Sequence, residues 1–176
     1  MALLFGALAD DLTGGMELAA MLVAHGVRCG FVTRPEALAE IGDDFDAVVI
    51  ARKTRVVPAA DAVAAFEAGA RALLERGARQ LFFKYCATFD STDDGNIGPC
   101  ADLLRELTGA KLTAFCPSFP EAGRRVFQGH LFADQMLISE SPKRFDPLTP
   151  MLDPNLVRTL QRQTKTRVGL IPQQVV

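Results

Sequence analysis

The chain has 176 residues, a formal net charge of −2, 49% hydrophobic residues and 23% charged residues. This composition suits one domain with a buried core, and the lack of a basic tract argues against nucleic acid as a partner. No apolar run approaches the ~20 residues that a membrane helix needs, and the apolar start has no basic leader. We therefore expect a cytoplasmic protein, with no membrane partner, whose four widely spaced cysteines are reduced and hold no metal.

Short apolar runs alternate with helical patterns along the first two thirds of the chain. Strands are expected at residues 3–8, 27–33, 45–51, 80–85 and 111–116. Helices are expected at residues 13–25, from Pro35, from Pro58 to Gly77, and at residues 99–107. This alternation predicts an α/β fold, with a mostly parallel sheet flanked by helices in βαβ repeats.

The pattern breaks between residues 117 and 150. Residues 126–128 and 136–139 are expected to form an antiparallel β-hairpin excursion near residues 125–139. Asp153 is then expected to cap a further helix, with Pro154 in its first turn. A last strand is expected at residues 167–171, shortly before the chain stops. We therefore interpret residues 1–176 as a single, apparently incomplete domain.

Polar residues gather where the expected strands end, which is where parallel α/β sheets bind ligands. Asp10 and Asp11 follow the first strand, and they could bind the hydroxyls of a polyol, hold Mg²⁺ or act as a general base. A cap at a helix N-terminus explains them equally well. Arg55 follows the third strand together with Arg52 and Lys53. Arginine can grip a carboxylate with two parallel hydrogen bonds, although a solvated loop would need no ligand.

Lys84 ends the fourth strand, where it is either an anion ligand or a lysine that snorkels at the sheet edge. The segment that follows combines small polar side chains with two glycines, which allow a ligand to approach the backbone. Its candidate ligands are Asp90, Ser91, Thr92 and Asn96. The helix N-terminus behind it favours an anion, but the segment has neither a Walker pattern nor GxGxxG, and a capped turn explains part of it.

Five motifs are familiar in this order along the chain. They are Ala-Asp-Asp-Leu-Thr-Gly (9–14), Lys-Tyr-Cys-Ala-Thr-Phe-Asp-Ser-Thr (84–92), Gly-Asn-Ile-Gly-Pro (95–99), Gln-Gly-His-Leu-Phe (128–132), and Pro-Leu-Thr-Pro-Met (147–151) with Asp-Pro-Asn-Leu-Val (153–157). Together they resemble the N-terminal substrate-binding domain of the four-carbon acid sugar kinases, and most of all the 3-oxo-tetronate kinase branch.

The resemblance implies ATP-dependent phosphorylation of a four-carbon sugar acid, such as 3-oxo-tetronate, at its terminal hydroxyl. It implies two α/β domains, one for the sugar acid and one for ATP with Mg²⁺. Carried onto this sequence, substrate contacts fall on Asp10 or Asp11, Arg55, Lys84 and the Asp-Ser-Thr run at 90–92. In the mechanism implied, one of the two first carboxylates orients or deprotonates the hydroxyl, while Arg55 and Lys84 hold the acid.

The sequence departs from the family pattern at residues 15–17, 87, 121–125 and 141–147, which puts the substrate in question. The larger departure is length, since no glycine-rich nucleotide-binding half is present. Phosphoryl transfer depends on groups that position and neutralise the transferred phosphate. We therefore expect no kinase activity from this chain alone. We expect a missing C-terminal domain or self-association to supply a partner surface.

Two other interpretations stay open. A receiver-like signalling module would bind Mg²⁺ through the paired acids, although the third strand ends in Ala51-Arg52-Lys53 and not in the aspartate that such a module phosphorylates. A stand-alone or decayed sugar-acid-binding protein would bind without turnover.

Overall fold

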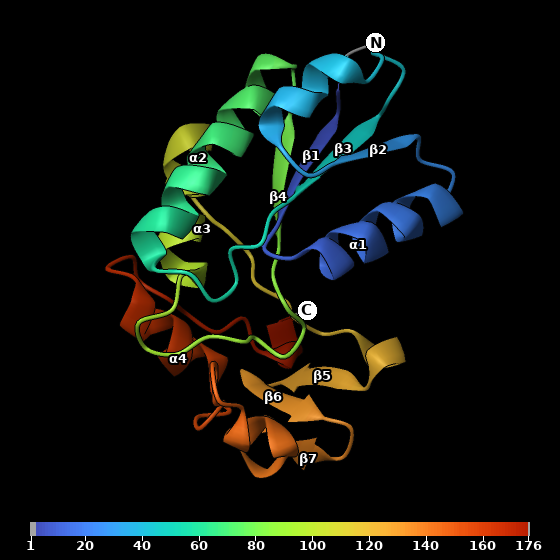
Figure 1. Ribbon diagram of the computed structural model, residues 1–176. Coiled ribbons are helices and arrows are strands. Elements are labelled where there is room, and N and C mark those ends of the chain that lie inside the picture. Colours follow the sequence, from blue (N-terminus) through green and yellow to red (C-terminus); the bar gives the residue numbers. More distant parts are fainter. Residues whose placement is uncertain (1–2, 176) are drawn as a thin grey trace.

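The computed structural model describes residues 3–175. A parallel sheet has the strand order β2-β3-β1-β4, as Figure 1 shows. Its strands are β1 (Phe5–Ala9), β2 (Cys29–Val32), β3 (Ala47–Ala51) and β4 (Gln80–Lys84). Helix α1 (Leu12–Ala24) covers one face, and helices α2 (Ala59–Glu75) and α3 (Ile97–Thr108) cover the other. The predicted α/β class is confirmed.

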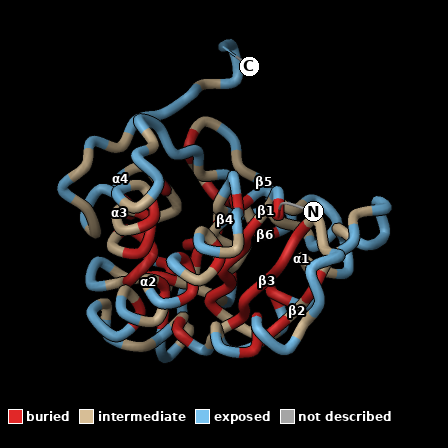
Figure 2. Tube along the Cα trace, turned by 90° about the horizontal axis from the view of Figure 1, so that it is seen from above, coloured by how far each residue is buried: buried red, intermediate tan, exposed pale blue. Residues whose placement is uncertain are grey.

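Successive side chains of a central strand point to opposite faces, which gives the sheet two cores. In β1, Leu8 packs with Phe66 of α2, whereas Ala9 lies in the smaller core beneath α1. Small residues let α1 approach closely, because a Cβ at Gly15 would lie 2.6 Å from the Cβ of Ala51. Figure 2 shows the buried residues running along these central strands and the helix surfaces that face them.

A second, antiparallel sheet follows, with the order β5-β6-β7 (Figure 1). Its strands are β5 (Arg124–Phe127), β6 (His130–Ala133) and β7 (Met136–Leu137). The predicted β excursion is confirmed, but the direct pairing of residues 126–128 with 136–139 is wrong, because β6 lies between them. Gln128 and Gly129, with φ of 48° and 75°, form a two-residue turn that leads from β5 straight into β6.

Helix α4 (Leu156–Gln163) begins two residues later than the predicted cap at Asp153 allows. Asn155 is the N-cap, and its side chain accepts a hydrogen bond from the Arg158 N–H at 3.0 Å. Asp153 instead accepts from the Asn155 N–H and forms an ion pair with Arg158. Helix α4 packs against α3, so it joins the second sheet to the first.

Two predicted strands, at residues 111–116 and 167–171, are wrong, since neither stretch is in a strand. A strand exists only when a neighbour pairs with its backbone. Within the described chain, residues 111–118 form no backbone–backbone hydrogen bond. The remaining ordered segments are short 3₁₀ helices at Pro35–Glu40, Pro120–Ala122, Ile138–Glu140, Pro142–Phe145 and Gln173–Val175.

Candidate functional site

Three parallel strands bring the candidate site together, because β1, β3 and β4 end side by side. Ala9 lies opposite Ala51 on one side and Lys84 on the other. Backbone hydrogen bonds continue past the strand ends: the Asp10 N–H donates to the Lys84 carbonyl at 3.1 Å, and the Thr54 N–H donates to the Asp10 carbonyl at 2.8 Å. The segments after the three strands therefore form one rim.

Asp10 and Arg55 form a two-pronged ion pair at the centre of this rim. The Arg55 Nη2 and Nε atoms donate to the two Asp10 carboxylate oxygens at 2.8 and 3.2 Å. Burial raises the pKa of Asp10, against the opposing effect of Arg55. Burial lowers the pKa of Arg55, but the hydrogen bond to Asp10 and the negative charges of Asp10 and Asp11 together leave that pKa above its ordinary value. Both Asp10 oxygens are engaged, so this carboxylate orients the arginine.

Asp11 is the more open of the two neighbouring carboxylates. Its side chain is 29% exposed, against 4% for Asp10. Its Oδ1 caps α1 by accepting from the Gly14 N–H at 2.7 Å, and it also lies 3.0 Å from Arg55 Nη2. The predicted helix cap is therefore confirmed at Asp11, and the same carboxylate reaches the rim.

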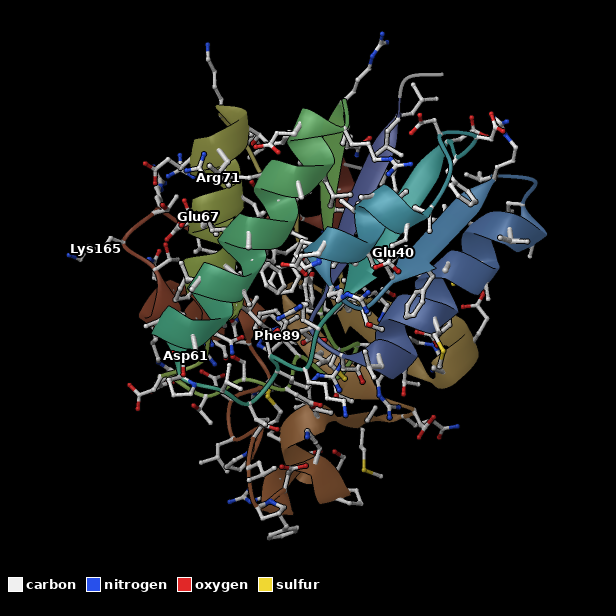
Figure 3. The ribbon with its side chains drawn as sticks, turned by 45° about the horizontal axis from the view of Figure 1, so that its top comes forward. Glu40, Asp61, Glu67, Arg71, Phe89 and Lys165 are labelled. Atoms are coloured by element: carbon white, nitrogen blue, oxygen red, sulfur yellow. The ribbon has the colours of Figure 1, made fainter. Side chains whose placement is uncertain are left out.

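A tight turn after β4 brings the chain back to the rim beside Arg55. Phe89 has a φ of 52°, unusual for a bulky residue, and its N–H donates to the Cys86 carbonyl at 2.8 Å. Its side chain lies in the interior, as Figure 3 shows, and the residue is 1% exposed. The next residue, Asp90, accepts a hydrogen bond from the Thr88 hydroxyl and lies 3.8 Å from Arg55 Nη1. Burial of Phe89 therefore holds the turn that places Asp90 at the rim.

Lys143 is a site residue that the sequence did not predict. Its Nζ lies 2.8 Å from Asp90, 2.7 Å from Asp146 and 3.1 Å from the Thr149 hydroxyl. Burial lowers the pKa of Lys143, but its hydrogen bonds to the two carboxylates outweigh this and raise that pKa overall. The same contact holds the pKa of Asp146 well below its usual range. The only sequence signal was the departure from the family pattern at residues 141–147.

We call these five residues the charged cluster: Asp10, Asp11, Arg55, Asp90 and Lys143. Lys84 lies beside it, 3.4 Å from a Glu17 carboxylate oxygen and 3.4 Å from its neighbour's carbonyl. These contacts are long compared with those of Arg55, and the Lys84 side chain is 19% exposed. Lys84 is thus the most loosely held of the site's cations.

Two cavities adjoin the site. A groove of about 800 Å³ runs along β4 and reaches the rim at Lys84 and Ala87. A cavity of about 530 Å³ lies against the β5–β7 sheet and is lined by Thr88, Lys143 and Asp146, among others. Each of the two cavities is therefore lined by one lysine of the site, Lys84 in the groove and Lys143 in the smaller cavity.

The other predicted ligands have mainly structural contacts. The Gln163 side chain donates to the Ser91 hydroxyl and to the Thr92 carbonyl, both at 2.6 Å. The buried Asn96 side chain donates to the Thr54 carbonyl at 2.7 Å. Within residues 3–175, no hydrogen bond joins these side chains to a carboxylate of the charged cluster. Their role as substrate ligands stays a prediction.

Other chemistries find less support at this rim. Among the described residues, no group of three or more His, Cys, Asp or Glu side chains could hold a metal ion. Arg55 itself lies between the carboxylates of Asp10 and Asp11, where a cation would otherwise fit. Burial raises the pKa of Cys86, which keeps it a thiol and unsuited to attack as a nucleophile. No described helix is long and apolar enough to cross a membrane.

The fold and the rim define an α/β domain with charged side chains at the carboxyl ends of its strands, which is where such sheets bind their ligands. Residues 5–176 match the family described as the sugar-binding N-terminal domain. The chain belongs to this family.

Related proteins extend the comparison. The chain is 53% identical, over 169 residues, to a 3-oxo-tetronate kinase of Burkholderia multivorans, covering 96% of this chain but 39% of the relative. A solved Haemophilus influenzae protein is 38% identical with a TM-score of 0.86, covering 96% of this chain and 41% of that one. A Bordetella bronchiseptica protein, solved as a domain-swapped dimer with bound citrate, is 26% identical with a TM-score of 0.77, covering 89% and 39%. The chain thus spans about two fifths of the curated relatives that it matches.

Proposed function

We propose that this chain binds a four-carbon sugar acid, such as 3-oxo-tetronate, as the substrate-holding part of an ATP-dependent kinase. The observation that carries the proposal is the meeting of Asp11, Arg55 and Asp90 at the carboxyl ends of three parallel strands. The relatives named as 3-oxo-tetronate kinases support the substrate class, because eight of them are 39–53% identical to this chain over the matched residues.

Asp11 is the carboxylate that we assign to the reacting hydroxyl. One of its oxygens is used by the helix cap and by Arg55, while a substantial part of the side chain stays open to solvent. Asp10 is buried with both oxygens on Arg55, so we assign it the role of positioning the arginine. These contacts favour Asp11 over Asp10 as the base, a choice that the sequence left open.

Lys84 and Arg55 would hold the carboxylate of the sugar acid. Lys84 has only long contacts, so a substrate anion can replace them at little cost. Arg55 is anchored by Asp10 through Nε and Nη2, while its Nη1 has only a distant contact with Asp90 at 3.8 Å. The citrate held by the Bordetella protein is a small polyanion with a hydroxyl, which agrees with an acid-binding site in this family.

ATP and Mg²⁺ would be held by the part of the kinase that this chain does not span. The nucleotide supplies the phosphoryl group when it is bound, and Asp11 would take the proton from the accepting hydroxyl. The chain alone would therefore bind substrate without turnover, as one incomplete domain over residues 1–176. The receiver-like interpretation finds no support in the family to which the chain belongs.

Calorimetric titration tests the acid-binding role. The chain should bind a four-carbon sugar acid more tightly than the matching four-carbon polyol, and Lys84→Met should remove most of that difference, about 10-fold or more. Lys165→Met is the matched control, since Lys165 points into solvent away from the rim in Figure 3. Equal binding of acid and polyol by the unmodified chain would contradict the proposal.

The hydroxyl-activating role needs a chain that can turn over, such as this chain fused to the remaining part of the Burkholderia relative. Asp11→Asn in that fusion should lower kcat by about 10²–10⁴-fold while leaving the affinity for the sugar acid nearly unchanged. An unchanged kcat would rule out Asp11 as the base.

A further inference from the structure

The outer edge of β4 is open. Strand β4 pairs with β1 on one side, and among residues 3–175 no strand pairs with its other side. Strand β4 is apolar, like a strand in the middle of a sheet, and its Leu81 and Phe83 side chains are partly buried against the core. An open edge on such a strand is unusual, because proteins normally cover or pair it.

A second stretch of extended chain runs along this open edge at a distance. Residues 110–119 descend beside β4 in Figure 1, and both stretches line the groove of about 800 Å³ that separates them. Residues 111–118 form no backbone–backbone hydrogen bond within the described chain. Two unpaired lengths of backbone therefore lie on opposite sides of one groove.

Apolar side chains from helices on both faces of the sheet line the groove. On the α1 side it is lined by Leu18 and Met21, and on the α3 side by Ala101 and Leu104. Its charged lining residues, Glu17, Arg79, Lys84 and Arg105, leave the middle of β4 to Leu81, Phe82 and Phe83. A strand covered by helices on both faces is apolar on both faces, so the groove has the walls of a buried strand position.

We propose that this groove receives one extended strand, inserted between β4 and residues 111–116 and matching the five residues of β4 in length. The occupant is an apolar, uncharged segment from the part of the family's polypeptide outside this chain. That part makes up about three fifths of the relatives, of which the chain covers 39–41%. Insertion would pair both open backbones at once, and would turn residues 111–116 into the strand that their sequence predicts.

Amide hydrogen exchange tests the proposal without reference to sugar binding. In this chain, the amides of residues 112–116 should exchange almost freely, whereas those of β3 are protected. In the full-length Burkholderia relative, the aligned residues should exchange at least about 100-fold more slowly. Equally fast exchange of those residues in the folded relative would overturn the proposal.

Substitutions on one helix locate the strand. In this chain fused to the remaining part of the relative, Met21→Asp should restore fast exchange at residues 112–116, because Met21 lines the groove. Val23→Asp is the matched control on the same helix, with 56% exposure against 45% for Met21, and it should have no such effect. Equal effects of the two would overturn the proposal. So would concentration-dependent protection of β4 in the unfused chain, which would assign the groove to a second copy.

Discussion

Asp10 and Arg55 show how burial and charge oppose each other in a single pair. The Asp10 carboxylate is 4% exposed, so its burial costs hydration free energy. The attraction to Arg55 offsets this cost only because two close hydrogen bonds join the pair. Removing one partner of such a pair leaves a charge buried without compensation, whereas removing one partner of an exposed pair costs little. The cost of removing a charged side chain, measured as a loss in the free energy of unfolding, should therefore depend on how deeply its pair is buried.

Asp10→Ala should lower the free energy of unfolding by about 3 kcal/mol, the low end for a broken buried pair, because Arg55 keeps Asp11 within 3.0 Å. Glu67→Gln removes the exposed Glu67–Arg71 pair on α2, visible on the surface in Figure 3, and should cost about 0.5 kcal/mol at most. Urea denaturation of the two variants measures both. Equal losses would contradict the role of burial.

Asp153 gives the protein a defined response to acid. Its hydrogen bond with Arg158 lowers the pKa of Asp153 from 3.8 to about 2. A group with a lowered pKa in the folded state stabilises above its unfolded pKa, and this contribution is lost as the pH falls through the folded pKa. The thermal midpoint should therefore drop between about pH 4 and pH 2, and Asp153→Asn should make that part of the profile shallower. An unchanged slope in the variant would refute this.

At the scale of elements, the contact between α3 and α4 fixes the loop that carries Asp90. The Gly98 N–H donates to the Gln163 side chain at 2.9 Å, and the same side chain holds the Ser91 hydroxyl and the Thr92 carbonyl. Gly98 leaves no room for a side chain, because a Cβ there would lie 2.9 Å from the Gln163 carbonyl oxygen. One glutamine therefore ties the last helix to the rim.

Gly98→Ala should lower the free energy of unfolding by about 1–3 kcal/mol, because backbone cannot move aside as a flexible side chain can. Gly42→Ala is the control, since a Cβ at Gly42 meets no atom within 4 Å. Chemical denaturation compares the two. A neutral Gly98→Ala would mean that α4 shifts freely against α3.

Local patterns predicted the βαβ units because apolar spacing and capping glycines act within a few residues. The prediction of a strand at residues 111–116 failed because a strand also needs a neighbouring strand to pair with, which local sequence does not reveal. At the site, strand ends predicted the meeting of Asp10, Asp11 and Arg55, since the carboxyl ends of parallel strands share one edge. Lys143 could not be predicted in this way, because it reaches Asp90 across more than fifty residues from a 3₁₀ helix.

At the scale of the whole molecule, the charged cluster lies where the parallel sheet meets the β5–β7 sheet. Asp90 contacts Arg55 at the strand ends and Lys143 beside the smaller sheet, so one carboxylate links the two parts. A ligand that binds Arg55 in place of Asp90 would therefore change contacts both at the strand ends and beside the smaller sheet.

The most direct test of the account is the backbone amide NMR spectrum of the chain, titrated first with a four-carbon sugar acid and then, separately, with Mg-ATP. The account predicts saturable shifts of the amides of residues 10–14, 54–55 and 84–90 with the sugar acid, with the β2 amides unchanged, and no saturable shifts with Mg-ATP. Saturable shifts confined to residues away from the ends of β1, β3 and β4, or tight binding of Mg-ATP alone, would contradict it.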